Sequence, residues 1–147
     1  MRTVAAVGTC LLAVALLTGC EDPGRLAPLS ISRDGDTLLV AVCADISATS
    51  VTVSERDPNE DWRDIFVASG QAIFRPGDVL RVPDGYAGLV SSKTSNARFN
   101  KASLLAVSLD ASEADKSILG SFHGLSTLKA GSWTSPTGVV SPYPCKA

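Results

Sequence analysis

The stretch Thr37-Leu-Leu-Val-Ala-Val-Cys43 decides the fold class of this chain. It is a short apolar run rich in β-branched residues, which predicts a buried strand. The turn pair Asp34-Gly35 precedes it, and residues 29–32 alternate between apolar and hydroxyl side chains, so the region predicts a β-hairpin. On the other side, residues 51–54 read Val-Thr-Val-Ser. This alternation is expected of a strand with one face in the core and the other in water.

The same period of two recurs along the chain, interrupted by turn residues. Further strands are predicted at residues 62–67, 72–74, 79–82, 86–90, 105–109 and 139–140. Gly70 is expected to interrupt the chain between two of them, and the polar residues 91–100 to form an exposed loop. Asp110 and Glu113 resemble a capping box, which predicts one short helix through about residue 117. About seven or eight short strands with at most one short helix predict an all-β fold, an antiparallel β-sandwich.

The tryptophan and cysteine positions do not match the immunoglobulin form of the sandwich. Immunoglobulin domains place a core Trp between two bridged cysteines. Trp62 follows Cys43 by 19 positions, but Cys145 is the third residue from the chain end. We therefore expect a sandwich outside the immunoglobulin family.

The N-terminal residues 1–19 have the layout of a bacterial export signal. Arg2 supplies positive charge, residues 4–17 are almost without polarity, and small residues precede Cys20. The stretch Leu17-Thr18-Gly19-Cys20 resembles the lipobox of bacterial lipoproteins. The resemblance implies that Cys20 receives a diacylglycerol, that residues 1–19 are removed, and that the lipid holds the protein on the extracytoplasmic side of the cell membrane.

Three other interpretations of this segment stay open. An uncleaved transmembrane anchor needs roughly 18–20 apolar residues, more than this run supplies. Cys10 is a second candidate for the modified residue, although Thr9 stands where Gly, Ala or Ser is expected and the position is close to the N-terminus. The third interpretation is an ordinary secretory signal followed by an incidental cysteine.

Removal of the signal leaves 128 residues, a size that fits one domain. Residues 20–28 combine charges with Pro and Gly and predict a lipidated tether, and residues 29–147 form the predicted β-sandwich domain. The mature chain has 12 basic and 15 acidic side chains, so its formal charge moves from −2 to −3. This balance argues against nucleic acid as a partner, because nucleic-acid binding needs concentrated positive charge. No second apolar run of spanning length follows, so the lipid on Cys20 is expected to be the sole membrane attachment.

Two cysteines remain once Cys20 is lipidated and Cys10 is removed with the signal. They are Cys43 and Cys145, 102 positions apart. An exported location permits disulfides, so we expect one intramolecular bridge between them. The alternative is two buried free thiols.

Residue types that carry catalysis are scarce. His123 is the only histidine, it stands in Gly120-Ser-Phe-His-Gly124, and no Gly-x-Ser-x-Gly elbow occurs. Ser126 and Lys129 fit a Ser-x-x-Lys pattern, and Lys93-Thr94-Ser95 faintly resembles the Lys-Thr-Gly of penicillin-binding enzymes. The order of these two elements is reversed relative to that family and the domain is too small, so we expect no catalytic residue and no cofactor.

Charged loops supply two weaker candidates for a binding site. Residues 57–61 imitate the opening of a calcium loop, with Glu55 and Asp64 nearby, but Trp62 occupies the position of the required Gly and Ala68 that of the bidentate Glu. We expect a solvated acidic turn and no metal site, with weak calcium binding as the alternative. Lys93, Arg98 and Lys101 form a modest basic patch around Phe99, which suits lipid headgroups or an anionic wall polymer.

The sequence therefore predicts a lipid-anchored protein of the bacterial envelope that acts without catalysis. Its expected partners are the membrane, through the lipid on Cys20, and an unidentified envelope protein or polymer. The alternative is a small envelope hydrolase that uses a serine near His123.

Overall fold

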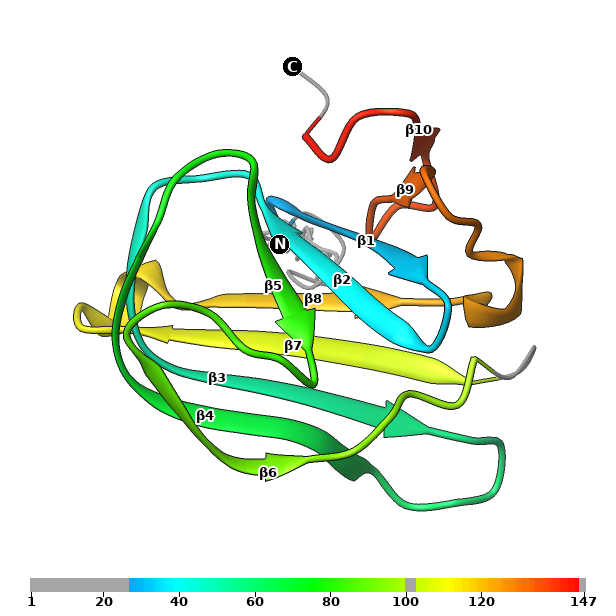
Figure 1. Ribbon diagram of the computed structural model, residues 1–147, viewed down its shortest axis with the longest axis horizontal. Helices are drawn as coiled ribbons and strands as arrows, with labels where there is room; N and C mark the ends of the chain where they lie inside the picture. The colour runs from blue at the N-terminus through cyan, green and yellow to red at the C-terminus, as the bar shows by residue number, and fades with distance from the viewer. Residues whose placement is uncertain (1–26, 100–102, 146–147) are drawn as a thin grey trace, which may run out of the picture.

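The computed structural model describes residues 27–99 and 103–145. The export signal, Cys10, Cys20 and most of the tether lie outside the described residues, as does Lys101. In the described part, the strands form two antiparallel five-stranded sheets packed against each other (Figure 1). The predicted all-β sandwich is confirmed.

The two sheets, here named A and B, each combine pairs of consecutive strands with pairs of strands distant in sequence. Sheet A has the order β10-β9-β1-β2-β5 and sheet B the order β6-β4-β3-β7-β8. The strands of sheet A are β1 (Leu29–Asp34), β2 (Thr37–Val42), β5 (Asp78–Val82), β9 (Trp133–Thr134) and β10 (Val140–Ser141). The strands of sheet B are β3 (Ile46–Arg56), β4 (Arg63–Phe74), β6 (Leu89–Thr94), β7 (Leu104–Ala111) and β8 (Ile118–Phe122).

The hairpin at the start of the domain follows its sequence pattern. Asp34 pairs with Thr37 across the two-residue turn Gly35-Asp36, which joins β1 to β2. Gly35 has a φ of 59°, a left-handed conformation that glycine adopts without steric cost and that a tight hairpin requires. Leu38 and Val40 on β2 are fully buried, so β2 is a core strand, as its sequence predicts.

The core lies between the sheets and receives side chains from both. Its largest fully buried side chains are Phe66, Phe74, Phe122, Ile31, Leu38, Ile65, Leu80, Leu105, Leu109, Leu125 and Leu128. Burying one such side chain contributes about 1.5–3 kcal/mol relative to leaving it in water. The sandwich is therefore held chiefly by apolar burial along alternating strand positions.

The prediction that Gly70 interrupts the chain between two strands was wrong. β4 runs unbroken from Arg63 to Phe74, and Gly70 lies inside it. A Cβ atom at Gly70 would collide with the carbonyl oxygen of Gly88, which lies beside the strand and accepts a hydrogen bond from Gln71. Glycine is needed here for close backbone approach, a role that sequence patterns do not separate from strand breaking. Trp62 lies just before β4 and is exposed, so it is not a core Trp of the immunoglobulin type.

The predictions of a strand at residues 86–90 and of a loop at residues 91–100 were also wrong in part. β6 begins only at Leu89 and continues to Thr94, so it includes residues expected to form a loop. It is the edge strand of sheet B and its side chains from Val90 onward are exposed. Because backbone hydrogen bonds to β4 form this strand, its polar side chains hide it from an analysis of hydrophobic periodicity.

Helical structure is shorter than predicted. Residues 112–117 between β7 and β8 contain one 3-10 turn, η2 (Ala114–Lys116), and a second turn, η3 (Leu125–Thr127), follows β8. Six residues leave no room for a stable α-helix, which needs about 12 residues on its own. β8 and β9 were not predicted, whereas the last edge strand is present as β10.

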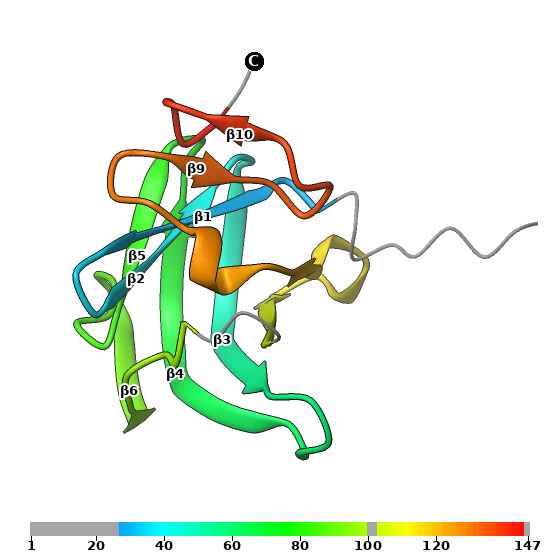
Figure 2. The ribbon, with the colours of Figure 1, turned by 90° about the vertical axis from the view of Figure 1, so that its right-hand side faces the viewer.

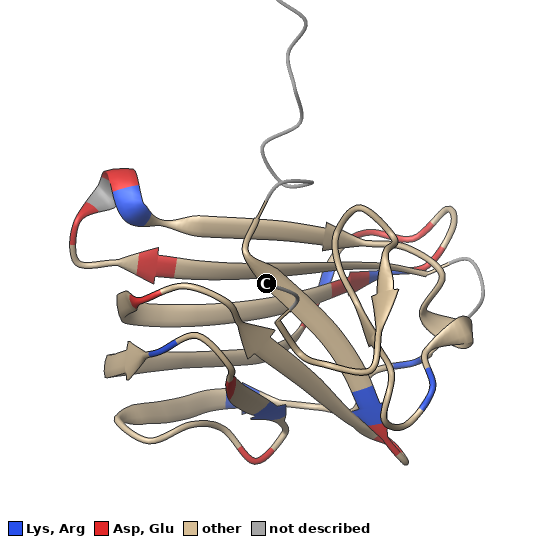
Figure 3. Ribbon diagram, turned by 90° about the horizontal axis from the view of Figure 1, so that it is seen from above, with Lys and Arg blue, Asp and Glu red and all other residues tan. Residues whose placement is uncertain are grey.

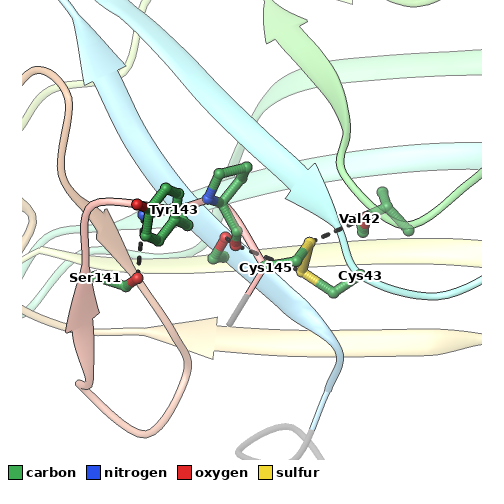
Figure 4. Close-up of a disulfide and its surroundings, with 7 residues drawn as sticks. Val42, Cys43, Ser141, Tyr143 and Cys145 are labelled. Atoms are coloured by element: carbon green, nitrogen blue, oxygen red, sulfur yellow. Dashed lines mark hydrogen bonds between the residues drawn. A yellow bond between two sulfur atoms is a disulfide. The ribbon is translucent and has the colours of Figure 1, made fainter. Parts of the chain in front are cut away.

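The C-terminal segment crosses the outer face of sheet A. The disulfide between Cys43 and Cys145 holds it there, with Cα atoms 5.4 Å apart (Figure 4). The Sγ of Cys145 lies 3.6 Å from the carbonyl oxygen of Val42. This is a van der Waals contact and not a hydrogen bond, because a disulfide sulfur carries no hydrogen. Ser30 donates a hydrogen bond to the carbonyl oxygen of Pro144 and is buried, although it faces away from the core. The tail therefore covers part of the face that sheet A would otherwise expose.

Candidate interaction surface

The side chains named for the hydrolase alternative are exposed and lie outside the core. His123 follows the last residue of β8 and Ser126 lies on η3, and both side chains are exposed. In the described residues, no hydrogen bond joins His123 to a serine or to a carboxylate. A catalytic base needs such a contact with the nucleophile it activates. The geometry therefore offers this alternative no positive support.

The two elements that resemble penicillin-binding enzymes belong to different parts of the fold. Ser126 lies on η3 and Lys129 shortly after it, whereas Lys93 and Thr94 lie on the edge strand β6. The carbonyl oxygen of Lys129 accepts a hydrogen bond from Ser32 Oγ at 3.3 Å. The segment thus takes part in closing the outer face of sheet A.

The acidic turn and the basic patch meet in a single ion-pair cluster. One guanidinium nitrogen of Arg98 lies 2.9 Å from Asp57 and 3.2 Å from Glu60, across about 40 residues of sequence. The backbone N–H of Arg98 also donates to both carboxylate oxygens of Glu55, at 2.9 and 3.0 Å. Arg63 completes the cluster with a 3.0 Å contact to Glu55.

The contacts within this cluster favour the charged forms of Asp57 and Arg98. The hydroxyl of Ser103 and the guanidinium of Arg98 both donate to Asp57 and hold the pKa of its carboxyl below the ordinary value. The pKa of Arg98 is raised by the same pairing. A carboxyl with a lowered pKa stays ionised near neutral pH and is poorly suited to proton transfer. The cluster is therefore built to connect two loops rather than to perform acid–base chemistry.

The calcium interpretation gains no support from this geometry. Asp57 and Glu60 are engaged by Arg98, so their oxygens do not converge on an empty centre. Over residues 27–99 and 103–145, no group of three or more His, Cys, Asp and Glu side chains gathers as a metal site requires.

The basic patch predicted around Phe99 is not assembled as expected. Arg98 is neutralised by two carboxylates, and Lys93 lies on β6. Phe99 packs against the core, with the guanidinium of Arg33 at 5.3 Å from its ring centroid. Lys101 lies outside the described residues. Arg98 and Phe99 therefore help to close one end of the sandwich and do not form a free cationic surface.

The outer face of sheet B is a broad surface, and the strand register shows which residues form it. Thr52 on β3 has Val67 of β4 on one side and Ser108 of β7 on the other, and this row continues to Lys93 and Leu119 at the two edges. Small uncharged side chains dominate the same face in the adjoining rows: Ser50, Ser54, Ser69, Ala106 and Ser121. These residues alternate with the buried positions, so they point away from the core.

Exposed aliphatic side chains accompany this face. Ile73 is 70% exposed and Val90 is 75% exposed, and both lie on strands of sheet B. Two acidic residues lie in other rows of the same face, and each accepts a hydrogen bond from a serine: Ser54 donates to Asp64 at 2.7 Å and Ser50 donates to Asp110 at 2.5 Å. The face therefore carries few charges, Lys93, Asp64 and Asp110 among them. Sequence reasoning missed it because its residues come from five strands whose neighbours are set by the topology.

The described residues contain no helix with the length and hydropathy required to cross a membrane. Comparison with models of protein families, with characterised proteins and with solved structures finds no match to this chain.

Proposed function

We propose that this chain is an exported lipoprotein whose β-sandwich is a non-catalytic binding module of the bacterial envelope. The lipobox-like stretch that ends at Cys20 supports the anchor. The observation that carries the binding role is the contrast between the two outer faces. Sheet A is covered in part by the C-terminal segment, whereas sheet B presents a face with few charges and with exposed Ile73 and Val90. The buried centres of protein interfaces are depleted in charged residues, and this face has few of them.

The chemistry of that face favours an envelope protein over an anionic polymer as partner. Lys93 is the basic residue of the central row, and Asp64 and Asp110 add negative charge beside it. An anionic polymer would need a cluster of positive charge. A face with few charges and with exposed aliphatic side chains instead suits contact with a protein surface.

Replacing Cys20 tests the anchor. Cys20→Ser removes the thiol that accepts the lipid, so the protein should leave the detergent-soluble membrane fraction or stay unprocessed. Cys10→Ser is the matched control, because it changes the other cysteine of the signal and should alter neither partitioning nor the mature N-terminus. Unchanged partitioning of Cys20→Ser would reject the lipid anchor.

Site-specific photocrosslinking tests the binding face. A photoreactive amino acid at Ser69, in the middle of sheet B, should capture one discrete protein in intact cells. The same group at Glu113, an exposed residue of the turn after β7, should not. Equal capture from both positions, or capture from neither, would contradict the assignment of this face.

The hydrolase alternative has its own test. His123→Ala should leave the cellular role of the protein intact, judged by complementation of a deletion strain with a phenotype. Loss of that role in a variant of normal abundance would favour the hydrolase.

A further inference from the structure

A groove of about 280 Å³ lies where the described chain begins. Its lining includes Ala27 and Pro28 at that start and Trp133, Val139 and Tyr143 from the C-terminal segment, and none of its lining residues is charged. The disulfide adjoins it, since Cys43 is part of the same lining. The groove is thus bordered both by the segment that leads back to Cys20 and by the tail that the disulfide holds.

The segment around this groove is exposed and yet carries no charge. Residues 130–145 contain no charged side chain, and the ribbon leading to the C-terminus is tan in Figure 3. Val140 is 65% exposed and Tyr143 is 70% exposed. Solvated loops normally carry charges, and a Tyr with an exposed ring is amphipathic, with an apolar body and a polar hydroxyl.

The length of the tether limits which side of the domain can approach a membrane. Seven residues lead from Cys20 to Ala27, a span of at most about 25 Å when fully extended. A compact domain of about 100 residues has a radius of gyration of roughly 13 Å, so this span is no longer than the domain is wide. A lipid on Cys20 therefore keeps the groove side of the domain close to the bilayer.

We propose that the groove and the β9–β10 hairpin form the membrane-facing side of the domain and lie in the lipid headgroup region. This inference rests on the proposed lipid attachment at Cys20. Trp and Tyr side chains are favoured at the level of the headgroups, where one part of the ring is apolar and the other is hydrated. The tether itself is a poorer occupant, because Glu21 and Asp22 would place charge in an uncharged groove.

The two tryptophans report on opposite ends of the molecule. Figures 1 and 2 place the loop between β3 and β4 on the far side from β9 and β10. Trp62 is the last residue of that loop, immediately before β4, and Trp133 lines the groove. Trp62→Phe therefore leaves a probe of the groove, and Trp133→Phe leaves a probe of the distant end.

The experiment uses full-length lipidated protein reconstituted into vesicles of phosphatidylcholine and phosphatidylglycerol, with the phosphatidylcholine carrying brominated acyl chains. Bromine quenches tryptophan fluorescence at short range. Quenching of Trp133 should exceed that of Trp62 by roughly twofold or more, because only the groove lies at the interface. Val140→Asp should lower the quenching of Trp133, whereas Val90→Asp, the same change at an exposed valine of sheet B, should leave it unchanged.

Each other outcome overturns the proposal in a distinguishable way. Protein that co-floats with the vesicles but shows no quenching of Trp133 is anchored with its groove facing water or covered by the tether. Equal quenching of both tryptophans would mean that the domain has no preferred orientation. Protein that fails to co-float would reject the lipid anchor itself, and with it the basis of this inference.

Discussion

At the scale of single residues, the side chain that departs most from the pattern of its strand is Glu55. It occupies an inward-facing position of β3 and is only 2% exposed. Its carboxylate accepts hydrogen bonds from the backbone N–H of Arg98 and from the Arg63 guanidinium, so the buried charge of Glu55 is not left unpaired. A buried charge is tolerated when it is paired and hydrogen-bonded in this way. Glu55 thus connects β3 and β4 to the loop that follows β6.

Replacing Glu55 should therefore destabilise the domain. Glu55→Gln keeps the shape but removes the charge that both donors face, at a cost of roughly 1–3 kcal/mol. The lower half of that range is expected, because the Arg63 side chain is partly exposed and gains solvation when released. Asp61→Asn, a neutralisation at an exposed acid before β4, is the control. Equal urea-unfolding midpoints for the two variants would contradict the role of Glu55.

The ionised carboxyl of Asp57 should stabilise the folded protein in a way that depends on pH. Ser103 and Arg98 lower the pKa of its carboxyl in the folded protein below the ordinary 3.8. Stabilisation from a carboxyl with a lowered pKa is complete above the unfolded value and is lost as the pH falls through the folded one. The wild type should thus lose this stabilisation below about pH 3.8. Asp57→Asn should be less stable at neutral pH and change less on acidification, and parallel melting curves across this range would refute the idea.

At the scale of elements, the contact between β4 and the turn before β6 depends on two glycines, Gly70 in the strand and Gly88 in the turn. The N–H of Gln71 donates to the carbonyl oxygen of Gly88 at 3.0 Å, which holds the turn against the strand. A Cβ at Gly88 would collide with the carbonyl oxygen of Gln71, and Gly88 also has a φ of 86°. Because both partners are backbone, neither can move without breaking the pairing of β4 with β6.

Gly88→Ala and Gly77→Ala form a matched pair that separates collision from backbone strain. Gly77 has a φ of 98°, but nothing lies within 4 Å of its Cβ position. Gly77→Ala should cost roughly 1–2 kcal/mol for the left-handed conformation alone. Gly88→Ala carries the same strain and must displace backbone as well, so its free energy of unfolding should fall further. Chemical denaturation measures both values, and a larger loss for Gly77→Ala would exclude the collision.

At the scale of the whole molecule, the disulfide links the end of β2 to the C-terminal segment. Cys43 directly follows β2 and Cys145 closes the tail, with a sequence separation of 102. The bridge holds the segment that covers Ser30 and borders the groove near Ala27. One covalent bond therefore supports both the closure of sheet A and the shape of the proposed membrane-facing side.

Removing the bridge should loosen both features. Cys145→Ser is expected to cost about 2–5 kcal/mol, and the chain-entropy limit for a loop of roughly 100 residues is about 4.7 kcal/mol. The wild-type domain should bind no thiol reagent when denatured without reductant and two equivalents after reduction. Thermal melting of Cys145→Ser and of the double variant with Cys43→Ser should agree, because either change removes the same bond. Two titratable thiols in freshly isolated oxidised protein would exclude the bridge.

Local sequence patterns determined the features that depend on neighbouring residues. Alternation along residues 37–42 and 51–54, together with the Asp34-Gly35 turn, was enough to predict strands, a hairpin and a sandwich, because a half-buried strand must place apolar side chains at every second position. The pairing of Cys43 with Cys145 followed from the small number of cysteines.

The tertiary structure alone decided which distant residues meet. Arg98 joins the acidic residues of the β3–β4 loop because β6 returns beside β4, and no local pattern encodes that neighbour. Gly70 has to be a glycine because the backbone of Gly88 lies against it, and the face of sheet B exists because five strands align in register. Secondary structure responds to the side chains within a few residues, whereas surfaces and ion pairs depend on chain topology, which only the packing of the whole core selects.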